Sequence, residues 1–219
     1  MALVLLLLSC LSPSAAEGPV EVRAVEAPSA EPAVQALAEA DVPQVLAASD
    51  PWTLREGAAK AGVGWPPPGL RLAVHKSSRT LEALSGETVL KRYRVGLGVP
   101  EGDKERQGDG RTPEGELTIV THNAKSQFHR FLGLSYPSAD DADRGLAQGL
   151  ISASEAAAIR AADKADRLPP WNTALGGTVG IHGGGGWSDW TLGCVAVTDE
   201  EIEELFEVVH VGARVSITP

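Results

Sequence analysis

Short segments in which apolar and polar residues alternate begin at Leu70 and recur to the end of the chain. Alternation with a period of two is typical of strands with one buried face, and turns that carry glycine, such as Ser85-Gly86, agree with this interpretation. The pattern predicts a mainly β domain, with strands over residues 70–75, 80–84, 88–98, 115–122, 178–181 and 213–218.

Two stretches have helical character instead. Residues 139–167 are expected to be helical, and a capping box from Ser152 to Glu155 opens a run that ends before Pro169. A second capping box opens a later helix whose apolar residues fall on one face, and these are Ile202, Leu205, Phe206 and Val209. The sequence therefore predicts a helical insertion at 139–167 and a helix shortly after Cys194.

The start of the chain has the composition of an export signal. The apolar run Ala2–Leu8 is much shorter than the roughly 20 residues that a spanning helix needs, and it suits a signal peptide cleaved after Ala16. A second interpretation uses Leu7 to Cys10, which resembles a lipobox and would make Cys10 a lipid-anchored first residue. Both predict an exported protein of the periplasm or cell envelope, with no transmembrane helix in the mature chain.

Residues 17–69 are predicted to be a flexible acidic spacer rich in alanine and proline, with a short helix over 33–40 and a helix start within 51–64. The folded domain is then expected to span residues 70–219. The chain carries 19 Lys and Arg against 29 Asp and Glu, a net charge of −10. Nucleic-acid binding needs clustered Lys and Arg to neutralise phosphates, so the composition argues against a nucleic-acid partner.

Cys194 is a candidate reactive thiol. The chain has two cysteines, and removal or lipidation of the first leaves Cys194 without a disulfide partner. A lone cysteine in an oxidising compartment is either a buried inert residue or a reactive thiol. The reactive form is the thiolate, which a nearby histidine can generate, and His182 precedes a run of four glycines. Gly193 would let the backbone turn so that successive N–H groups converge on one spot, as an oxyanion hole requires.

The segments His182-Gly183 and Thr191-Leu192-Gly193-Cys194 resemble the catalytic signature of the L,D-transpeptidase (YkuD-type) family of bacterial cell-wall enzymes. The upstream stretches Gly98 to Lys104 and Gly108 to Gly115 look like the family's G-x-x-x-G-x-K and G-D-x-x-T-P-x-G motifs. The stretch from Asn123 to Pro137 is similar to a branch that includes murein endopeptidases. The resemblance covers roughly residues 70–218 and implies a β-sandwich with a helical insertion and a helix after the cysteine.

The resemblance also implies a reaction, namely acyl transfer on peptidoglycan stem peptides at diaminopimelate, by transpeptidation or hydrolysis. Cys194 would be the nucleophile and His182 its base, oriented by the carbonyl of Gly183. The N–H groups around Leu192, Gly193 and Cys194 would form the oxyanion hole. No metal or organic cofactor is expected. This chain departs from the family at two positions, with Leu192 where a second histidine is common and Ala196 where Asn or Arg is common.

Six further residues are candidate substrate contacts. They are Arg111, His129, Arg130, Tyr136, Trp190 and Thr191. A cation at Arg111 would suit the free carboxylates of stem peptides, and His129 could bind a carboxylate together with Arg130. The alternatives are a surface His and Arg at 129 and 130, a core tyrosine at 136, and a tryptophan that forms a wall at 190. The expected partner is peptidoglycan, with an envelope protein attached to it as a second candidate.

The sequence bears on three other functions. A papain-like protease places its cysteine early and its histidine late, opposite to the order here. The five histidines lack the spacing of a zinc site. A non-catalytic peptidoglycan-binding envelope lipoprotein that retains the fold remains the alternative outside the enzymes.

Overall fold

The computed structural model describes residues 48–219. The predicted signal segment, Cys10, the predicted helix over 33–40 and the spacer up to residue 47 lie outside the described residues. Within residues 48–219, no helix has both the length and the apolar character to cross a bilayer.

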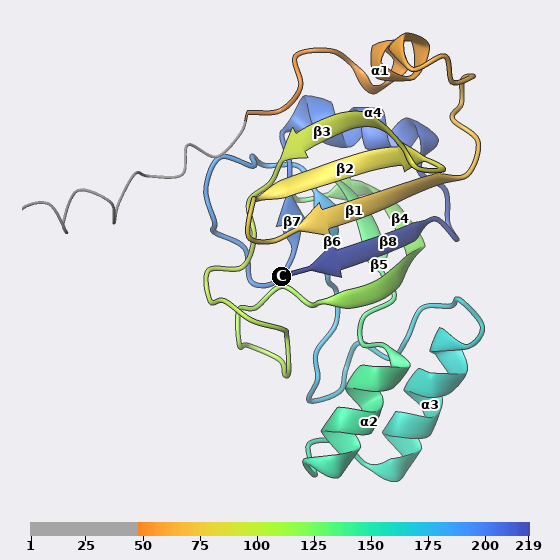
Figure 1. The fold of residues 1–219 in the computed structure, drawn as a ribbon. Helices are drawn as coiled ribbons and strands as arrows, with labels where there is room; N and C mark the ends of the chain where they lie inside the picture. The colour runs from red at the N-terminus through yellow and green to blue at the C-terminus, as the bar shows by residue number, and fades with distance from the viewer. Residues whose placement is uncertain (1–47) are drawn as a thin grey trace, which may run out of the picture. The chain divides into compact units, whose positions relative to one another are not determined.

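Eight strands form one continuous sheet in the order β3-β2-β1-β8-β4-β5-β6-β7 (Figure 1). Neighbouring strands are antiparallel except for the parallel pairs β1–β8 and β6–β7. The bounds are β1 Leu70–His75, β2 Thr80–Ser85, β3 Thr88–Arg94, β4 Gly115–Ser126, β5 His129–Leu134, β6 Gly180–His182, β7 Val195–Ala196 and β8 Arg214–Thr218. The predicted mainly β fold is confirmed, and β5 and β7 are strands that the alternation pattern did not predict.

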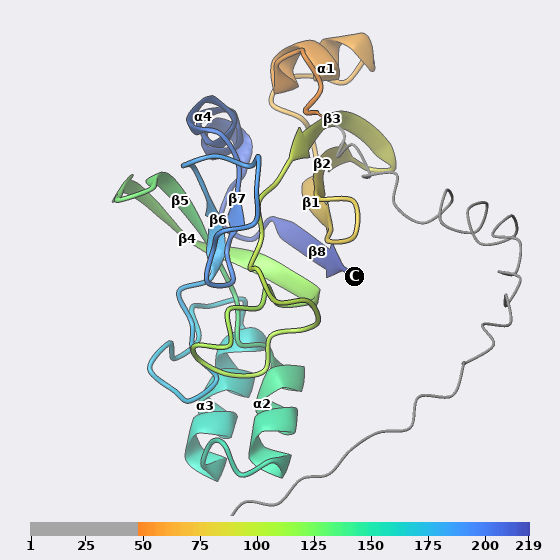
Figure 2. The same cartoon turned by 90° about the vertical axis from the view of Figure 1, so that its left-hand side faces the viewer.

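The sheet curls because β4 is shared between its two halves. The first residues of this 12-residue strand pair with β8, and its later residues pair with β5. Figure 2 shows the two wings from the side, with β1–β3 in one and β5–β7 in the other. The outer edges meet where Gly96, just beyond β3, bridges to Ala196 of β7. The main core fills the curled sheet, and Leu81, Ile119 and Ile181 are among its fully buried side chains.

Helix α4 (Asp199–Val208) is the predicted helix after Cys194. Thr198 caps its N-terminus and forms the predicted capping box with Glu201. Its apolar face reaches the main core through Ile202 and Leu205, which have no exposed surface.

Helices α2 (Ala139–Ala147) and α3 (Ala153–Asp163) form the predicted insertion, which extends away from the sheet (Figure 1). The two helices are separate because the predicted capping box from Ser152 to Glu155 starts a new helix. The pair has a small core of its own, made of Ala142, Ile151, Ala156, Ile159 and Leu175. The insertion is therefore a helical hairpin rather than one helix.

Helix α1 (Leu54–Lys60) belongs to the folded body, whereas the composition of residues 17–69 predicts a spacer. Leu54 and Ala58 are fully buried in the main core, and the Trp52 indole N–H donates to the carbonyl of Leu90 at 3.2 Å. Helix α1 contacts β3, and the hydrogen bond that Trp52 donates just before the helix reaches a residue 38 positions later in the sequence. Local composition therefore carries no sign of its docking, and the folded part begins before residue 70.

This docking leads to a stability prediction. Replacing Leu54 by alanine leaves a cavity under α1, so we expect the free energy of unfolding to fall by about 2–5 kcal/mol. Urea unfolding followed by circular dichroism measures it. Arg55→Ala is the matched control, because that exposed side chain makes a surface ion pair with Glu207 worth at most about 1 kcal/mol. Equal stability of Leu54→Ala and the parent would show that α1 is not part of the core.

Candidate active site

His182 ends strand β6 and is held from several sides. It lies opposite Phe131 of β5 and opposite Ala196 of β7. Its ring stacks on Phe128 with centroids 4.5 Å apart, and the edge of Trp190 packs at 5.6 Å. Only 1% of the residue is exposed. The orientation of the imidazole is therefore set by packing.

The tautomer of His182 is set by one hydrogen bond. Nδ1 lies 2.6 Å from the carbonyl oxygen of Gly183, and a carbonyl can only accept, so Nδ1 carries the proton. Burial lowers the pKa of His182 below its usual value, and this hydrogen bond only partly opposes the effect. The ring is thus neutral near physiological pH, with the lone pair of Nε2 free to accept a proton.

Cys194 lies on the same sheet face as His182. Strands β6 and β7 run parallel with Ile181 opposite Val195 and His182 opposite Ala196. Cys194 directly precedes β7, so extending this register by one residue puts it opposite Gly180. Because side chains alternate between faces along a strand, residues 182 and 194 project to one side as diagonal neighbours. The sequence expectation that these two side chains come together is consistent with this register.

The Cys194 thiol is half-buried and opens onto a groove. Its S–H donates to the carbonyl of Thr178 at 3.7 Å. Burial raises the pKa of Cys194, while an N–H from Gly180 and the charge of Lys104 act in the opposite direction. The resting pair is therefore a neutral thiol and a neutral imidazole. The groove has a volume of about 620 Å³ and is lined by Thr121, His122, Asn123, Lys125, Ser126, Gln127, Phe128, Phe131, Trp171, Thr178 and Cys194.

Gly193 gives the loop before Cys194 its shape. Its φ of +129° is a backbone conformation that favours glycine, and a Cβ there would lie 2.6 Å from the carbonyl oxygen of Arg111. The Thr191 hydroxyl donates to the carbonyl of Cys194 at 2.7 Å and accepts the Gly193 N–H at 3.2 Å. Since the Gly193 N–H is already used, the remaining candidate oxyanion donors are the N–H groups of Leu192 and Cys194, which donate to no acceptor within residues 48–219.

A buried ion pair supports this loop from behind. Lys104 is 3% exposed, and its Nζ lies 2.7 Å from Asp109 and 3.7 Å from where a Gly193 Cβ would be. Asp109 also accepts backbone N–H groups from Glu105, Arg106 and Arg111. Lys104 and Asp109 belong to the two upstream motifs, and the motifs by themselves do not indicate that these side chains pair. Their pairing places the Arg111 carbonyl against Gly193.

The ion pair has a predicted effect on stability. Burial raises the pKa of Asp109, but the hydrogen bonds from Lys104 and the backbone outweigh it and lower this pKa to about 2. A carboxyl with a lowered folded-state pKa stabilises the protein above its unfolded pKa, and this contribution disappears as pH falls from about 4 to about 2. We expect Asp109→Asn to cost about 2 kcal/mol near neutral pH and to flatten the loss of stability in this acid range.

Urea unfolding at several pH values measures both effects. Asp140→Asn, which removes an exposed carboxyl from α2, is the matched control. If Asp109→Asn lost as much stability as the parent when the pH is lowered through this acid range, the proposed stabilisation by the Asp109 carboxylate would be contradicted.

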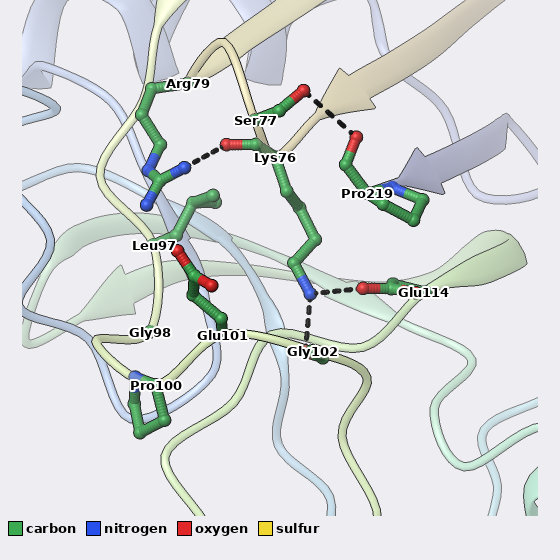
Figure 3. A pocket seen from close by; sticks show the side chains of 10 residues that line it. All are labelled: Lys76, Ser77, Arg79, Leu97, Gly98, Pro100, Glu101, Gly102, Glu114 and Pro219. Carbon is green, nitrogen blue, oxygen red and sulfur yellow. Dashed lines mark hydrogen bonds and ion pairs between the residues drawn. The ribbon is translucent and has the colours of Figure 1, made fainter. Parts of the chain in front are cut away.

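A second anchor holds the loop between β3 and β4. The Nζ of Lys76 donates to the carbonyl of Gly102 at 2.6 Å, to that of Thr112 at 3.0 Å and to the Glu114 carboxylate at 2.7 Å. Lys76 is one of the residues that line a cavity of about 410 Å³. Figure 3 shows its ammonium between Gly102 and Glu114. Thr112 in turn accepts the Gly98 N–H through its hydroxyl, at 2.9 Å. The loop that flanks Gly193 is therefore fixed at both ends.

Three of the six predicted substrate contacts lie outside the groove that contains Cys194. Tyr136 has no exposed surface and its hydroxyl donates to the Leu175 carbonyl at 3.1 Å, so it is the core tyrosine that the sequence left as the alternative. His129 and Arg130 both pair with Glu203 of α4, at 2.7 and 3.0 Å. None of these three lines the groove that contains Cys194.

The other three predicted contacts lie close to Cys194. Arg111 contributes its carbonyl to the Gly193 turn, and its side chain reaches Glu105 at 3.7 Å. Thr191 is buried and holds the loop, while Trp190 packs against the imidazole and is 37% exposed. Sequence reasoning missed the polar residues Asn123, Lys125, Ser126 and Gln127 as groove lining, although they lie in the stretch quoted for the resemblance. Within residues 48–219, no three His, Cys, Asp or Glu side chains gather as metal ligands would.

Comparison with known proteins gives one family match. The family of L,D-transpeptidase catalytic domains (YkuD) matches residues 70–217. No curated protein matches the chain.

Solved structures similar to this chain include three proteins of low identity. An L,D-transpeptidase from Xylanimonas cellulosilytica is 15% identical, with 74% of this chain and 68% of that one covered and a TM-score of 0.43. The helical cell shape determining protein Pgp2 (K307A mutant) from Campylobacter jejuni is 18% identical, with 68% and 46% covered and a TM-score of 0.47. An L,D-transpeptidase from Mycobacterium smegmatis is 11% identical, with 70% and 60% covered and a TM-score of 0.43. This chain spans less than two thirds of the length of the last two.

Proposed function

Because the chain belongs to the L,D-transpeptidase (YkuD) catalytic domain family, we propose that it transfers acyl groups on peptidoglycan stem peptides with Cys194 as the nucleophile. One observation carries the proposal. The thiol opens onto a groove from the sheet face that also presents His182, a neutral imidazole protonated on Nδ1. A thiol and a base with these protonation states are what general-base activation requires.

The first half-reaction forms a thioester. Nε2 of His182 accepts the thiol proton, and the sulfur attacks a carbonyl of diaminopimelate in the stem peptide. The N–H groups of Leu192 and Cys194 donate to the oxyanion of the tetrahedral intermediate. As that intermediate collapses, the C–N bond breaks, the leaving amine takes the proton from the imidazolium, and the acyl group stays on sulfur.

The second half-reaction releases the enzyme. An amine or a water molecule gives a proton to His182 and attacks the thioester, and the sulfur leaves as thiolate and regains the proton. An amine from a second stem peptide yields a crosslink, an amine of an envelope protein yields its attachment to the wall, and water yields hydrolysis. The groove suits a peptide substrate, since Asn123, Ser126 and Gln127 offer hydrogen bonds and Lys125 offers a charge for a carboxylate.

The site of action follows from the substrate. Peptidoglycan lies outside the cytoplasm, so the proposal places the protein in the periplasm or cell envelope, after cleavage behind Ala16 or lipidation of Cys10. The mass of the mature N-terminus, isolated from cells that export it, distinguishes these two routes.

Purified muropeptides test the proposed function. The protein is incubated with disaccharide tetrapeptides and with crosslinked dimers, and the products are separated by liquid chromatography and mass spectrometry. New dimers identify transpeptidation, and shortened stems or cleaved dimers identify hydrolysis. Binding of muropeptides with no change in their masses would instead favour the non-catalytic wall-binding lipoprotein.

A further inference from the structure

One peptide group links His182 to a carboxylate. The carbonyl of Gly183 accepts the Nδ1–H of His182 at 2.6 Å. The N–H of Gly184 belongs to the same peptide bond and donates to Oδ1 of Asp199 at 2.8 Å. The carboxylate and the imidazole are thus joined through a single, doubly hydrogen-bonded peptide group.

The turn after His182 is built to hold this peptide in one orientation. The Gly183 N–H donates to the carbonyl of Phe128 at 3.1 Å, and the Gly185 N–H donates to that of Val197 at 2.8 Å. Glycine is needed at 183, because a Cβ there would overlap Oδ1 of Asp199. Asp199 is the first residue of α4, so the helix sets the position of the carboxylate.

We propose that Asp199 is a positioning residue that orients and polarises the Gly183–Gly184 peptide, and through it the imidazole of His182. The inference rests on the proposed role of His182 as the base. A negative charge at the N–H end of a peptide increases the negative charge on its carbonyl oxygen, because hydrogen bonds in a chain strengthen one another. That oxygen then stabilises the imidazolium that forms when Cys194 loses its proton, as a directly bonded carboxylate does in a Ser-His-Asp triad.

The other groups near the turn do not replace this carboxylate. His129 of β5 packs beside Gly183, and its Nε2 is occupied by Glu203 of α4 at 2.7 Å. Phe128, Phe131 and Trp190 face the imidazole with uncharged rings. Among residues 48–219, Asp199 is the only carboxylate hydrogen-bonded to the turn.

Two substitutions at Asp199 separate charge from hydrogen bonding. Asp199→Asn keeps an oxygen acceptor without the charge, and Asp199→Ala removes both. Glu200→Gln is the matched control. Glu200 is exposed in the same first turn of α4, and its substitution removes the same charge near the helix N-terminus. Thermal unfolding of each variant identifies any that is not folded.

The first measurement is the pKa of His182, from its imidazole NMR signals during a pH titration. We expect Asp199→Asn to lower this pKa by about 0.5 unit, a modest shift because Asp199 is exposed to solvent and its charge is screened. Glu200→Gln should leave the titration unchanged. A folded Asp199→Asn variant that titrates like the parent would overturn the proposal.

The second measurement is the rate at which iodoacetamide alkylates Cys194 across the same pH range. Asp199→Ala is expected to slow it by about tenfold or more near neutral pH, and Asp199→Asn to slow it less. Rates that match the parent in both folded variants would also overturn the proposal. Neither measurement needs muropeptides, so a shift in His182 without muropeptide turnover would refute the proposed function and leave the role of Asp199 intact.

Discussion

Muropeptide conversion by Cys194→Ala is expected to fall to background, a loss on the order of 10⁴-fold or more, because no other group can form the acyl-enzyme. Cys194 is the only cysteine within residues 48–219, and its sulfur opens onto the groove. Cys194→Ser should lose nearly as much, since its hydroxyl ionises far less readily than a thiol. Product formation is followed by chromatography and mass spectrometry under saturating muropeptide.

Folding is the control for this first experiment. The side chain is half-buried and donates one long hydrogen bond, to Thr178, so neither variant should change the thermal unfolding temperature greatly. Turnover by a folded Cys194→Ala variant at the rate of the parent would rule out thiol catalysis.

His182→Gln is expected to reduce turnover by about 10²–10⁴-fold near neutral pH, the usual contribution of a general base. Glutamine has nearly the volume of histidine and can still donate to the Gly183 carbonyl, so the substitution mainly removes the base. Activity of the parent should fall on the acid side as His182 becomes charged, and burial lowers the pKa of His182 below its usual value. The decline therefore begins at a lower pH than for an exposed histidine.

The pH profile of His182→Gln should have a different form. Without the base, the rate depends on the small fraction of thiolate, so it should rise about tenfold per pH unit until the raised pKa of Cys194 is reached. His75→Gln is the matched control, because His75 lies on β1 and bonds to Thr218 and Glu82. A His182→Gln variant with the parent's rate and profile would exclude His182 as the base.

Local signals in the sequence predict much of the fold. Alternation identifies most of the strands from Leu70 onward, and the capping boxes at Ser152 and Thr198 locate the starts of α3 and α4. Both signals depend on residues within one element. Strand β5 was missed, because His129-Arg130-Phe131-Leu132-Gly133-Leu134 does not alternate, and β7 has only two residues.

Long-range contacts account for what the sequence did not predict. Helix α1 is held by residues of β3, and the turn after His182 is held by Asp199 of α4. Lys104 and Asp109 are close in sequence, but their importance depends on Gly193, more than eighty residues later. No period or motif within one segment indicates that such partners meet.

For the candidate site, too, the motifs were informative, whereas residue type alone was not. The motif letters predict Cys194, His182, Gly183 and Gly193 as site residues, and the register of β6 with β7 is consistent with the first two lying near one another. Residue type was a poorer guide to substrate contacts. His129 and Arg130 carry suitable chemistry for a carboxylate, yet Glu203 occupies both.

The central claim is that Cys194 is an acylable nucleophile in an open groove, and intact-protein mass spectrometry after exposure to a carbapenem tests it most directly. Enzymes of the family that the sequence resembles are acylated by these drugs. Because the adduct is stable, its detection does not require knowing which amine or water molecule resolves the thioester. We predict one adduct of the mass of the drug, mapped by peptide digestion to Cys194, present in the parent and absent from Cys194→Ala. A folded parent protein that gains no mass, or an adduct that persists in Cys194→Ala, would contradict the account.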